Sequence, residues 1–322
     1  MTSKDRVKAV IEKREFDRIP IYGWLRANME DKISEAFGSV EAFEDKYEFD
    51  YAHIFGEPET FSKDMLGAAK KQKGGLTPDD ILQMEMCDAN DSREWESVKA
   101  SIEFYGKDRQ RFTYIQTPGI FEKVNQYFGI ENHLMFLLLY PEDIMRLYRK
   151  QAEWNKQFAM NALDLGIDMI HVSDDWGGQN SLLFSPRIWK ESIAPNHKLI
   201  VDAVHARSAY ASLHSDGNIN EVLDGIAQLG YDVLHPYQIS AGMNYERYFK
   251  NYSESFTIMG GIDIQTTLGF GRTDDVKEEI DTVLRVFNVR GLLLCTSHFV
   301  QDHCSLEELV DTYDYIYSAV RK

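Results

Sequence analysis

Short apolar and β-branched runs alternate with longer helical stretches along most of this chain. We predict eight strands, within residues 19–24, 51–55, 111–117, 169–177, 210–219, 232–237, 256–263 and 291–294. Repeated strand-then-helix units favour a parallel barrel over an open sheet. The expected fold is therefore α/β, a single (β/α)8 TIM barrel over residues 1–322 with an N-terminal helical extension.

One part of the chain does not follow this alternation. Residues 60–101 are polar, contain Lys-Gln-Lys-Gly-Gly at 71–75 and show no clean helical or strand period. A long segment of this kind inside a compact domain is commonly a lid over a site. We expect it to be an inserted covering segment.

Composition and charge limit the classes of partner. With 43% hydrophobic and 27% charged residues, the chain has the make-up of a globular protein. A net charge of -17 argues against nucleic acid and anionic membranes, which bind basic surfaces. The longest apolar run, Leu134 to Tyr140, is too short to span a bilayer, and the amino terminus lacks the apolar core of a signal peptide. The three cysteines have no paired spacing, so a cytoplasmic location is expected.

The stretch Leu213-His-Ser-Asp-Gly-Asn ends a predicted strand in polar residues. Alternate strand residues point to the same face, so His214 and Asp216 could address one ligand together. The competing interpretation makes Asp216 a helix cap and His214 a core residue, and this stretch alone does not decide between them.

Polar side chains also follow the other predicted strands. In a barrel the carboxyl ends of all strands lie on one face, where active sites are built. Roughly a third of such residues should be caps or turn formers, and the remainder should line one pocket. The set comprises Arg26, Glu57, Asp174, Asp175, His214, Asp216, His235, Asp263 and His298.

Several short motifs, taken in their order and spacing, resemble the uroporphyrinogen decarboxylase superfamily over essentially the whole chain. They are the opening Thr2-Ser-Lys-Asp-Arg-Val-Lys-Ala-Val, Asp17-Arg-Ile-Pro, Ser173-Asp-Asp-Trp-Gly, Phe184-Ser-Pro-Arg-Ile-Trp, Leu213-His-Ser-Asp-Gly-Asn, Gly260-Gly-Ile-Asp and Ser297-His. The resemblance implies a single (β/α)8 barrel. It also implies one of two activities, porphyrinogen decarboxylation or the transfer of methyl groups to or from corrinoid proteins.

The decarboxylase branch carries an amino-terminal motif with two arginines that meet the substrate carboxylates. The matching region here, Gly23-Trp-Leu-Arg-Ala-Asn, has one arginine, Arg26. A substrate with eight carboxylates needs more cationic groups than that, and the net acidity of the chain points the same way. The methyltransferase branch is therefore the expected one.

That branch often binds zinc through a His-x-Cys pair and a later cysteine. Here Asp216 stands in place of the first cysteine and His298 in place of the second. The resemblance implies a zinc site of His214, Asp216 and His298, with Glu57 as a fourth ligand. Imidazole and carboxylate ligands leave zinc a harder Lewis acid than thiolates do, which suits an oxygen leaving group.

The resulting hypothesis is a methyltransferase that moves a methyl group from a methoxylated, aromatic small molecule to the cobalamin of a separate corrinoid protein. His214, Asp174, Asp175 and Glu57 are the expected catalytic residues. The expected substrate-binding residues are Arg26, Trp24, Trp176, His235, Tyr237, Gln238 and Asp263.

Three alternatives stay open. They are a methylcobalamin:thiol methyltransferase of the coenzyme M type, a porphyrinogen decarboxylase, and a ligand-binding barrel without catalysis. The sequence names neither the methyl donor nor the direction of transfer, and a homo-oligomer is as open as a monomer.

Overall fold

The computed structural model describes residues 1–56, 58–288 and 290–321. The described chain divides into two compact units. Unit 1 contains the described residues of 1–52, 105–112 and 232–322, and unit 2 contains those of 53–104 and 113–231. A single domain over residues 1–322 stays a prediction.

Seven strands run through the described residues, hydrogen-bonded in chain order. They are β1 (Tyr51–Ile54), β2 (Phe112–Thr117), β3 (Met169–Ser173), β4 (Tyr210–His214), β5 (Val233–His235), β6 (Thr257–Ile262) and β7 (Leu293–Thr296). The pairs β2–β3, β3–β4, β5–β6 and β6–β7 are parallel. Parallel strands alternating with helices confirm the predicted α/β class.

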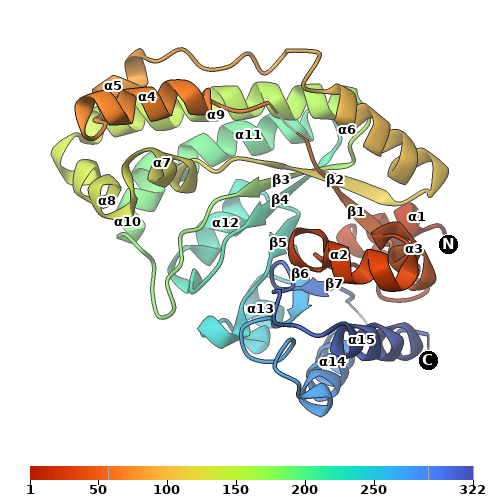
Figure 1. Cartoon of the computed structure of the whole chain (residues 1–322). Helices are drawn as coiled ribbons and strands as arrows, with labels where there is room; N and C mark the ends of the chain where they lie inside the picture. The colour runs from red at the N-terminus through yellow and green to blue at the C-terminus, as the bar shows by residue number, and fades with distance from the viewer. Residues whose placement is uncertain (57, 289, 322) are drawn as a thin grey trace. The chain divides into compact units, whose positions relative to one another are not determined.

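In unit 2, β3 pairs with β2 on one side and with β4 on the other. Every residue of β3 is buried, as expected of a parallel strand covered on both faces. Helix α9 (Pro141–Asp164) opens with a proline at its first position and packs against α11 (Ala194–His205) (Figure 1).

In unit 1, β6 pairs with β5 and β7, and α14 (Thr273–Phe287) packs against β6 and α15 (Leu306–Ala319). The strand predicted at 19–24 is reduced to a single parallel bridge between Ile21 and Leu294. Pro20 has no N–H, and the Ile21 N–H donates to the Asp50 carboxylate at 2.8 Å, so neither can extend a ladder.

The predicted covering segment, residues 60–101, contains three helices. They are α4 (Lys63–Lys73), α5 (Pro78–Gln83) and α6 (Glu96–Ser101), and a π-helix, η1 (Ile102–Asp108), follows them. Thr77 and Asp80 form a capping box at the start of α5, and α5 packs against α9 (Figure 1). Each helix is too short for a period to stand out in the sequence.

Residues 26–46 form two helices, α2 (Arg26–Phe37) and α3 (Val40–Lys46), because Gly38 adopts a φ of 87° and Ser39 caps α3. The remaining helical elements are α1 (Ser3–Ile11), α7 (Phe121–Phe128), α8 (Ile130–Leu139), α10 (Pro186–Ile188), η2 (Trp189–Ile193), η3 (Asn220–Val222), α12 (Leu223–Leu229), η4 (Ile239–Ala241) and α13 (Tyr245–Asn251).

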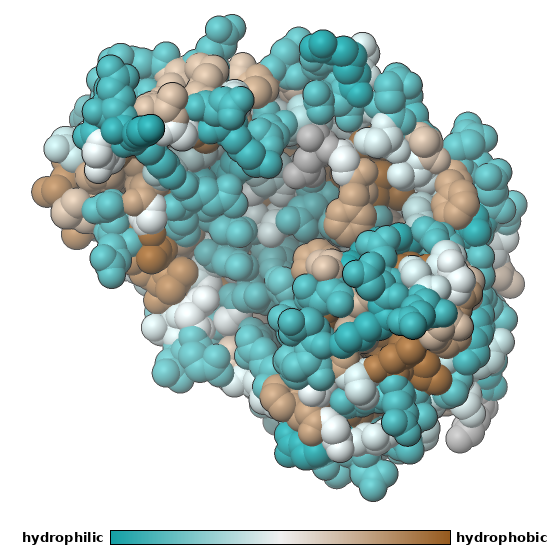
Figure 2. Space-filling view, in the orientation of Figure 1, coloured by the Kyte–Doolittle hydropathy of each residue, from teal (hydrophilic) through white to brown (hydrophobic). Residues whose placement is uncertain are grey.

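Helix α8 leaves apolar side chains on the surface of unit 2. Leu138 is 74% exposed and Leu139 60% exposed. In Figure 2, hydrophobic residues gather at the left of the view, over the α8 region. Among the described residues, no helix has both the length and the hydrophobicity that a membrane span requires.

Candidate functional site

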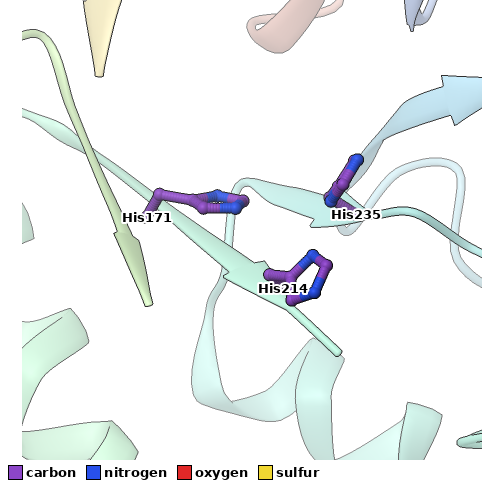
Figure 3. A group of neighbouring side chains, drawn as sticks. All are labelled: His171, His214 and His235. Carbon is purple, nitrogen blue, oxygen red and sulfur yellow. The ribbon is translucent and has the colours of Figure 1, made fainter. Parts of the chain in front are cut away.

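The first part of the candidate site is built by the pairing of β3 with β4 in unit 2. His171 is opposite Ser212 and Ser173 is opposite His214, so the polar residues of both strands share one face. His171 Nδ1 and Ser212 Oγ are hydrogen-bonded at 2.8 Å. The rings of His171 and His214 have centroids 5.9 Å apart, and Figure 3 shows them on the two neighbouring strands.

The turns that follow these two strands are joined backbone to backbone. The Asp216 N–H donates to Asp175 Oδ1 at 2.8 Å, and the Asn218 N–H donates to the Gly178 carbonyl at 2.8 Å. A Cβ atom on Gly177 would lie 2.5 Å from the Asp216 carbonyl oxygen. Only glycine permits this approach, which fixes the place of both acids.

His214 lies between two carboxylates. Its Nε2 atom is 3.5 Å from Asp175 Oδ1 and 3.9 Å from Asp216 Oδ1. His214 is buried, while the two carboxylates are about one-third exposed. Imidazole nitrogen and carboxylate oxygen are ligands that zinc accepts, so these donors fit a divalent cation.

Asp174 is surrounded by donors. Its carboxylate accepts from the backbone N–H groups of Phe121 at 3.2 Å and Glu122 at 2.7 Å, from Trp176 Nε1 at 2.8 Å and from His197 Nε2 at 2.8 Å. Because a carboxylate only accepts, His197 Nε2 donates to Asp174, and His197 Nδ1 is hydrogen-bonded to the Tyr231 hydroxyl at 2.7 Å. Asp174 thus holds the start of α7 in place, and Trp176 donates to the same carboxylate.

Glu122, in the first turn of α7, has a strongly shifted pKa. Burial raises it first, the charges of Asp175 and Asp174 raise it further, and the pKa of Glu122 reaches about 8. Ser173 Oγ donates to Glu122 Oε2 at 3.4 Å. Glu122 is therefore a carboxylic acid that keeps its proton at neutral pH.

Unit 1 holds another group of predicted site residues. Trp24 stacks on His235, with ring centroids 5.1 Å apart at 12°, and its ring centroid is 6.0 Å from that of His298. His235 Nε2 lies 3.3 Å from the Thr296 carbonyl oxygen. Trp24 is buried and fixes the imidazole of His235, a positioning role rather than an open aromatic wall.

Arg26 is engaged in a network of acids in unit 1. One of its Nη atoms lies 2.9 Å from Glu41 and 3.3 Å from Glu44, and donates to the Tyr105 hydroxyl. The pKa of Arg26 results from burial, which lowers it, and from the larger combined effect of these neighbours, which raises it. These contacts occupy the guanidinium that was expected to meet substrate.

A small cavity in unit 1 is lined by the remaining predicted substrate-binding residues, Tyr237, Gln238 and Asp263, with Glu279. The Tyr237 hydroxyl donates to the Asn244 carbonyl, and burial raises its pKa to about 12. The Glu279 carboxyl accepts from the Asp263 N–H at 3.2 Å, and burial raises the pKa of Glu279 to about 7.

Side chains that could bind a metal ion occur in both units among the described residues. In unit 2 these are His171, His214 and Asp216, and in unit 1 they are His235 and His298, so the described members of the predicted zinc site, His214, Asp216 and His298, are divided between the two units. Glu57, the fourth predicted ligand, lies outside the described residues.

Three site residues had not been singled out from the sequence. His171 interrupts an apolar strand two positions before Ser173, a period-2 signal that could have marked it. Glu122 and His197 lie on helices, and only contacts with residues more than 20 positions away in the chain bring them to the Asp174 and Asp175 pair.

Comparisons with known proteins point to one family. The family model described as "Uroporphyrinogen decarboxylase (URO-D)" matches residues 123–316, more than half of the chain. A methyltransferase structure from Methanosarcina mazei is similar with a TM-score of 0.73 and 14% identity, and 99% of each chain is covered. At this identity the likeness shows the fold, and it confirms the TIM-like expectation.

Other comparisons add little. A B12-independent methionine synthase from a Shewanella species aligns with a TM-score of 0.48 and 13% identity over 69% of this chain and 66% of that one. A TM-score of 0.48 is too low to support a conclusion about fold or function. No curated protein sequence matches the chain significantly.

Proposed function

Since this chain belongs to the uroporphyrinogen decarboxylase family, we propose that it is a methyltransferase that takes a methyl group from a methoxylated aromatic compound. The acceptor is the reduced cobalt of a cobalamin carried by a separate corrinoid protein. The observation that carries this proposal is a protonated acid, Glu122, beside Asp175, with His214 and Asp216 following in the same cluster.

Demethylation of an ether requires a good leaving group. The bond between the methyl carbon and the ether oxygen breaks, and the oxygen keeps the electron pair. That oxygen takes the proton of Glu122, while the methyl carbon bonds to the reduced cobalt, which supplies the new electron pair. General acid catalysis of this kind contributes about 100-fold to 10,000-fold in rate.

The surroundings of Glu122 suit this task. Ser173 donates to its carboxyl group, and the N-terminus of α7 is fixed by Asp174. Asp175 raises the proton affinity of Glu122 and also fixes Asp216 through the backbone N–H. Asp175 is thus a positioning residue in this scheme.

A zinc ion fits the donors around His214. In unit 2, His214 would hold it together with Asp175 and Asp216, whose carboxylate oxygens lie 3.5 Å and 3.9 Å from His214 Nε2. Bound zinc would act as a Lewis acid toward the ether oxygen, with which such nitrogen and oxygen ligands are compatible. The hydrogen bond between His171 Nδ1 and Ser212 Oγ orients the His171 ring.

The test is incubation of the full chain with chemically reduced cobalamin and a panel of methoxybenzenes. Formation of methylcobalamin, read by its absorbance, is the expected result. Glu122→Gln should lower the rate by about 100-fold, and the fall of wild-type activity above pH 8 should vanish in that variant. A folded protein that methylates no cobalamin from any ether in the panel would contradict the proposal.

The metal is tested separately. Protein purified without chelator should contain close to one zinc per chain, and His214→Ala should lose it. Absence of stoichiometric metal in the wild type would remove zinc from the scheme and leave acid catalysis by Glu122 to be judged by its own assay.

A further inference from the structure

Half of the large apolar side chains that the described residues expose lie within one short stretch of unit 2. This stretch, residues 130–145, comprises α8 and the start of α9, and Figure 2 shows hydrophobic residues gathered over the α8 region. We call the exposed residues the α8 patch. They are between 39% and 74% exposed and comprise Ile130, Met135, Leu138, Leu139, Tyr140 and Met145. Single apolar residues on a surface are ordinary, but a group of this kind marks an interaction site.

On α8 the exposed apolar residues form a stripe along the helix. Met135 is followed by Leu138 and Leu139 at spacings of three and four, so the three side chains lie on one face. The other face already packs within unit 2, because His133 and Leu137 are buried there. A helix that is apolar on both faces is normally buried on both. The stripe therefore lacks the cover that such a helix usually has.

The area of the α8 patch is what one side of a small dimer interface needs. With roughly 200 Å² for a whole large side chain, the exposed fractions of the six residues amount to about 600 Å². The largest apolar patch of a typical monomer is about 300–600 Å², so this patch lies at the upper end. Two such patches in contact would bury about 1,200 Å², the lower limit for a specific interface, before any polar border is added.

The charged border of the patch suits an identical partner. Residues 130–150 contain three acidic and three basic residues, so this stretch is neutral in a chain with a net charge of -17. Two copies of so acidic a chain repel each other, and a neutral surface is where they can meet at least cost. Glu131 and Glu142 are exposed at the border, as are Arg146 and Arg149, and Arg146 lies 3.2 Å from Asp143. A two-fold interface sets each surface against itself, so a border with both signs is complementary to its own copy.

We propose that the α8 patch binds the same patch of a second copy of this chain, so that the protein is a two-fold symmetric homodimer in solution. The apolar stripe forms the centre of the interface, and the acids on the border of one copy face the arginines of the other. The inference is independent of the proposed function, because none of the six patch residues takes part in the proposed reaction.

Sedimentation equilibrium of the full chain over a range of micromolar concentrations tests the proposal. The expected result is a species of twice the mass of one chain that dissociates on dilution. Leu138→Glu should raise the dissociation constant of the dimer at least about 100-fold, because both copies bring an unpaired carboxylate into the apolar centre. Leu138→Ala removes apolar area without adding a charge and should raise it about tenfold.

Met65→Glu is the matched control. Met65 is an apolar residue of α4 that is 49% exposed and lies outside the α8 patch, so the same new charge there should leave the dissociation constant unchanged. Hydrogen exchange locates the interface independently. Amides of residues 130–145 should exchange more slowly in concentrated protein than in dilute protein, whereas those of α4 should show no difference.

A wild-type chain that stays monomeric at hundred-micromolar concentration would overturn the proposal. So would a dimer that both Leu138 variants leave intact, or one that Met65→Glu weakens as much as Leu138→Glu. Protection of the α8 amides that appears only when a corrinoid protein is added would assign the patch to that partner and reject the homodimer. Circular dichroism of each variant verifies that it is folded before its mass is compared.

Discussion

Asp174 and Asp175 are adjacent in the chain and have opposite surroundings. Successive residues of an extended segment point to opposite sides, so one carboxylate enters the protein and the other faces the cluster at His214. Asp174 is completely buried and accepts four hydrogen bonds, whereas Asp175 is about one-third exposed and accepts the Asp216 N–H. The first acid organises structure and the second is available for chemistry.

Asp174→Asn should destabilise the protein more than Asp175→Asn. An asparagine turns an NH2 group toward buried donors that now lack an acceptor, which costs about 3 kcal/mol in the free energy of unfolding. Asp175→Asn should cost less than about 1 kcal/mol, because Asp175 is about one-third exposed. Urea denaturation of both variants checks this. Equal losses of stability would contradict the division of roles.

Glu122 should make the free energy of unfolding depend on pH well above 4.5, the ordinary pKa of a glutamate. Its folded pKa of about 8 lies above the unfolded value near 4.5, so the folded state binds the proton more tightly. The resulting stabilisation is fully present below about pH 4.5 and is lost as the pH rises through about 8. The amount is on the order of 5 kcal/mol.

Urea midpoints measured from pH 5 to pH 9 give this dependence. Glu122→Gln should flatten the wild-type decline, because glutamine does not titrate. Glu131→Gln, an exposed change in α8, is the control and should retain the decline. A wild-type decline that persists unchanged in Glu122→Gln would show that another group is responsible.

At the scale of elements, the turns after β3 and β4 are the parts that shape the candidate site. Gly217 has a φ of 79°, and a Cβ atom there would lie 2.5 Å from the Gly177 carbonyl oxygen. Both the left-handed backbone and the close approach exclude a side chain. The same turns carry Asp175 and Asp216, so their packing sets the place of the acids.

Gly217→Ala should therefore lower the free energy of unfolding by more than about 2 kcal/mol and reduce methyl transfer. Gly67→Ala offers a matched control within α4, where an added Cβ atom meets nothing within 4 Å. A helical glycine replaced by alanine should gain roughly 0.5–1 kcal/mol. In thermal melts, we expect a lower melting temperature than wild type for Gly217→Ala and a higher one for Gly67→Ala.

At the scale of the whole molecule, net charge bears on the choice between the proposed methyl transfer and the decarboxylase alternative. The chain carries a net charge of -17, and its Arg26 is paired with Glu41 and Glu44. A porphyrinogen with eight carboxylates would meet long-range repulsion and would find this guanidinium already engaged. These two facts weigh against decarboxylation.

The full chain incubated with uroporphyrinogen should accordingly release no partly decarboxylated porphyrin, measured chromatographically after oxidation. A high salt concentration screens the repulsion but leaves Arg26 paired with Glu41 and Glu44. We therefore expect no decarboxylated porphyrin at either low or high ionic strength. Turnover at any ionic strength would restore the decarboxylase alternative.

Much of the architecture could be predicted from the sequence, because it depends on local patterns. Apolar runs separated by helical stretches indicate parallel α/β structure, and the period of two placed His214 and Asp216 on one face. The strand predicted at 19–24 was too long, since Pro20 and the Asp50 carboxylate remove the donors that a full strand needs. The three short helices within residues 60–101 were not predicted, because none is long enough to show a helical period in the sequence.

The sequence by itself determined the class of fold, the resemblance to the family and the polar residues at the strand ends. Only the tertiary structure decided which of two adjacent acids is buried, that Arg26 is engaged in an ion-pair network, and that burial and two nearby acids raise the pKa of Glu122. Periodicity is a property of neighbours in the chain, whereas burial and charge at a carboxylate depend on residues about 50 positions away, such as Asp174 and Asp175 for Glu122.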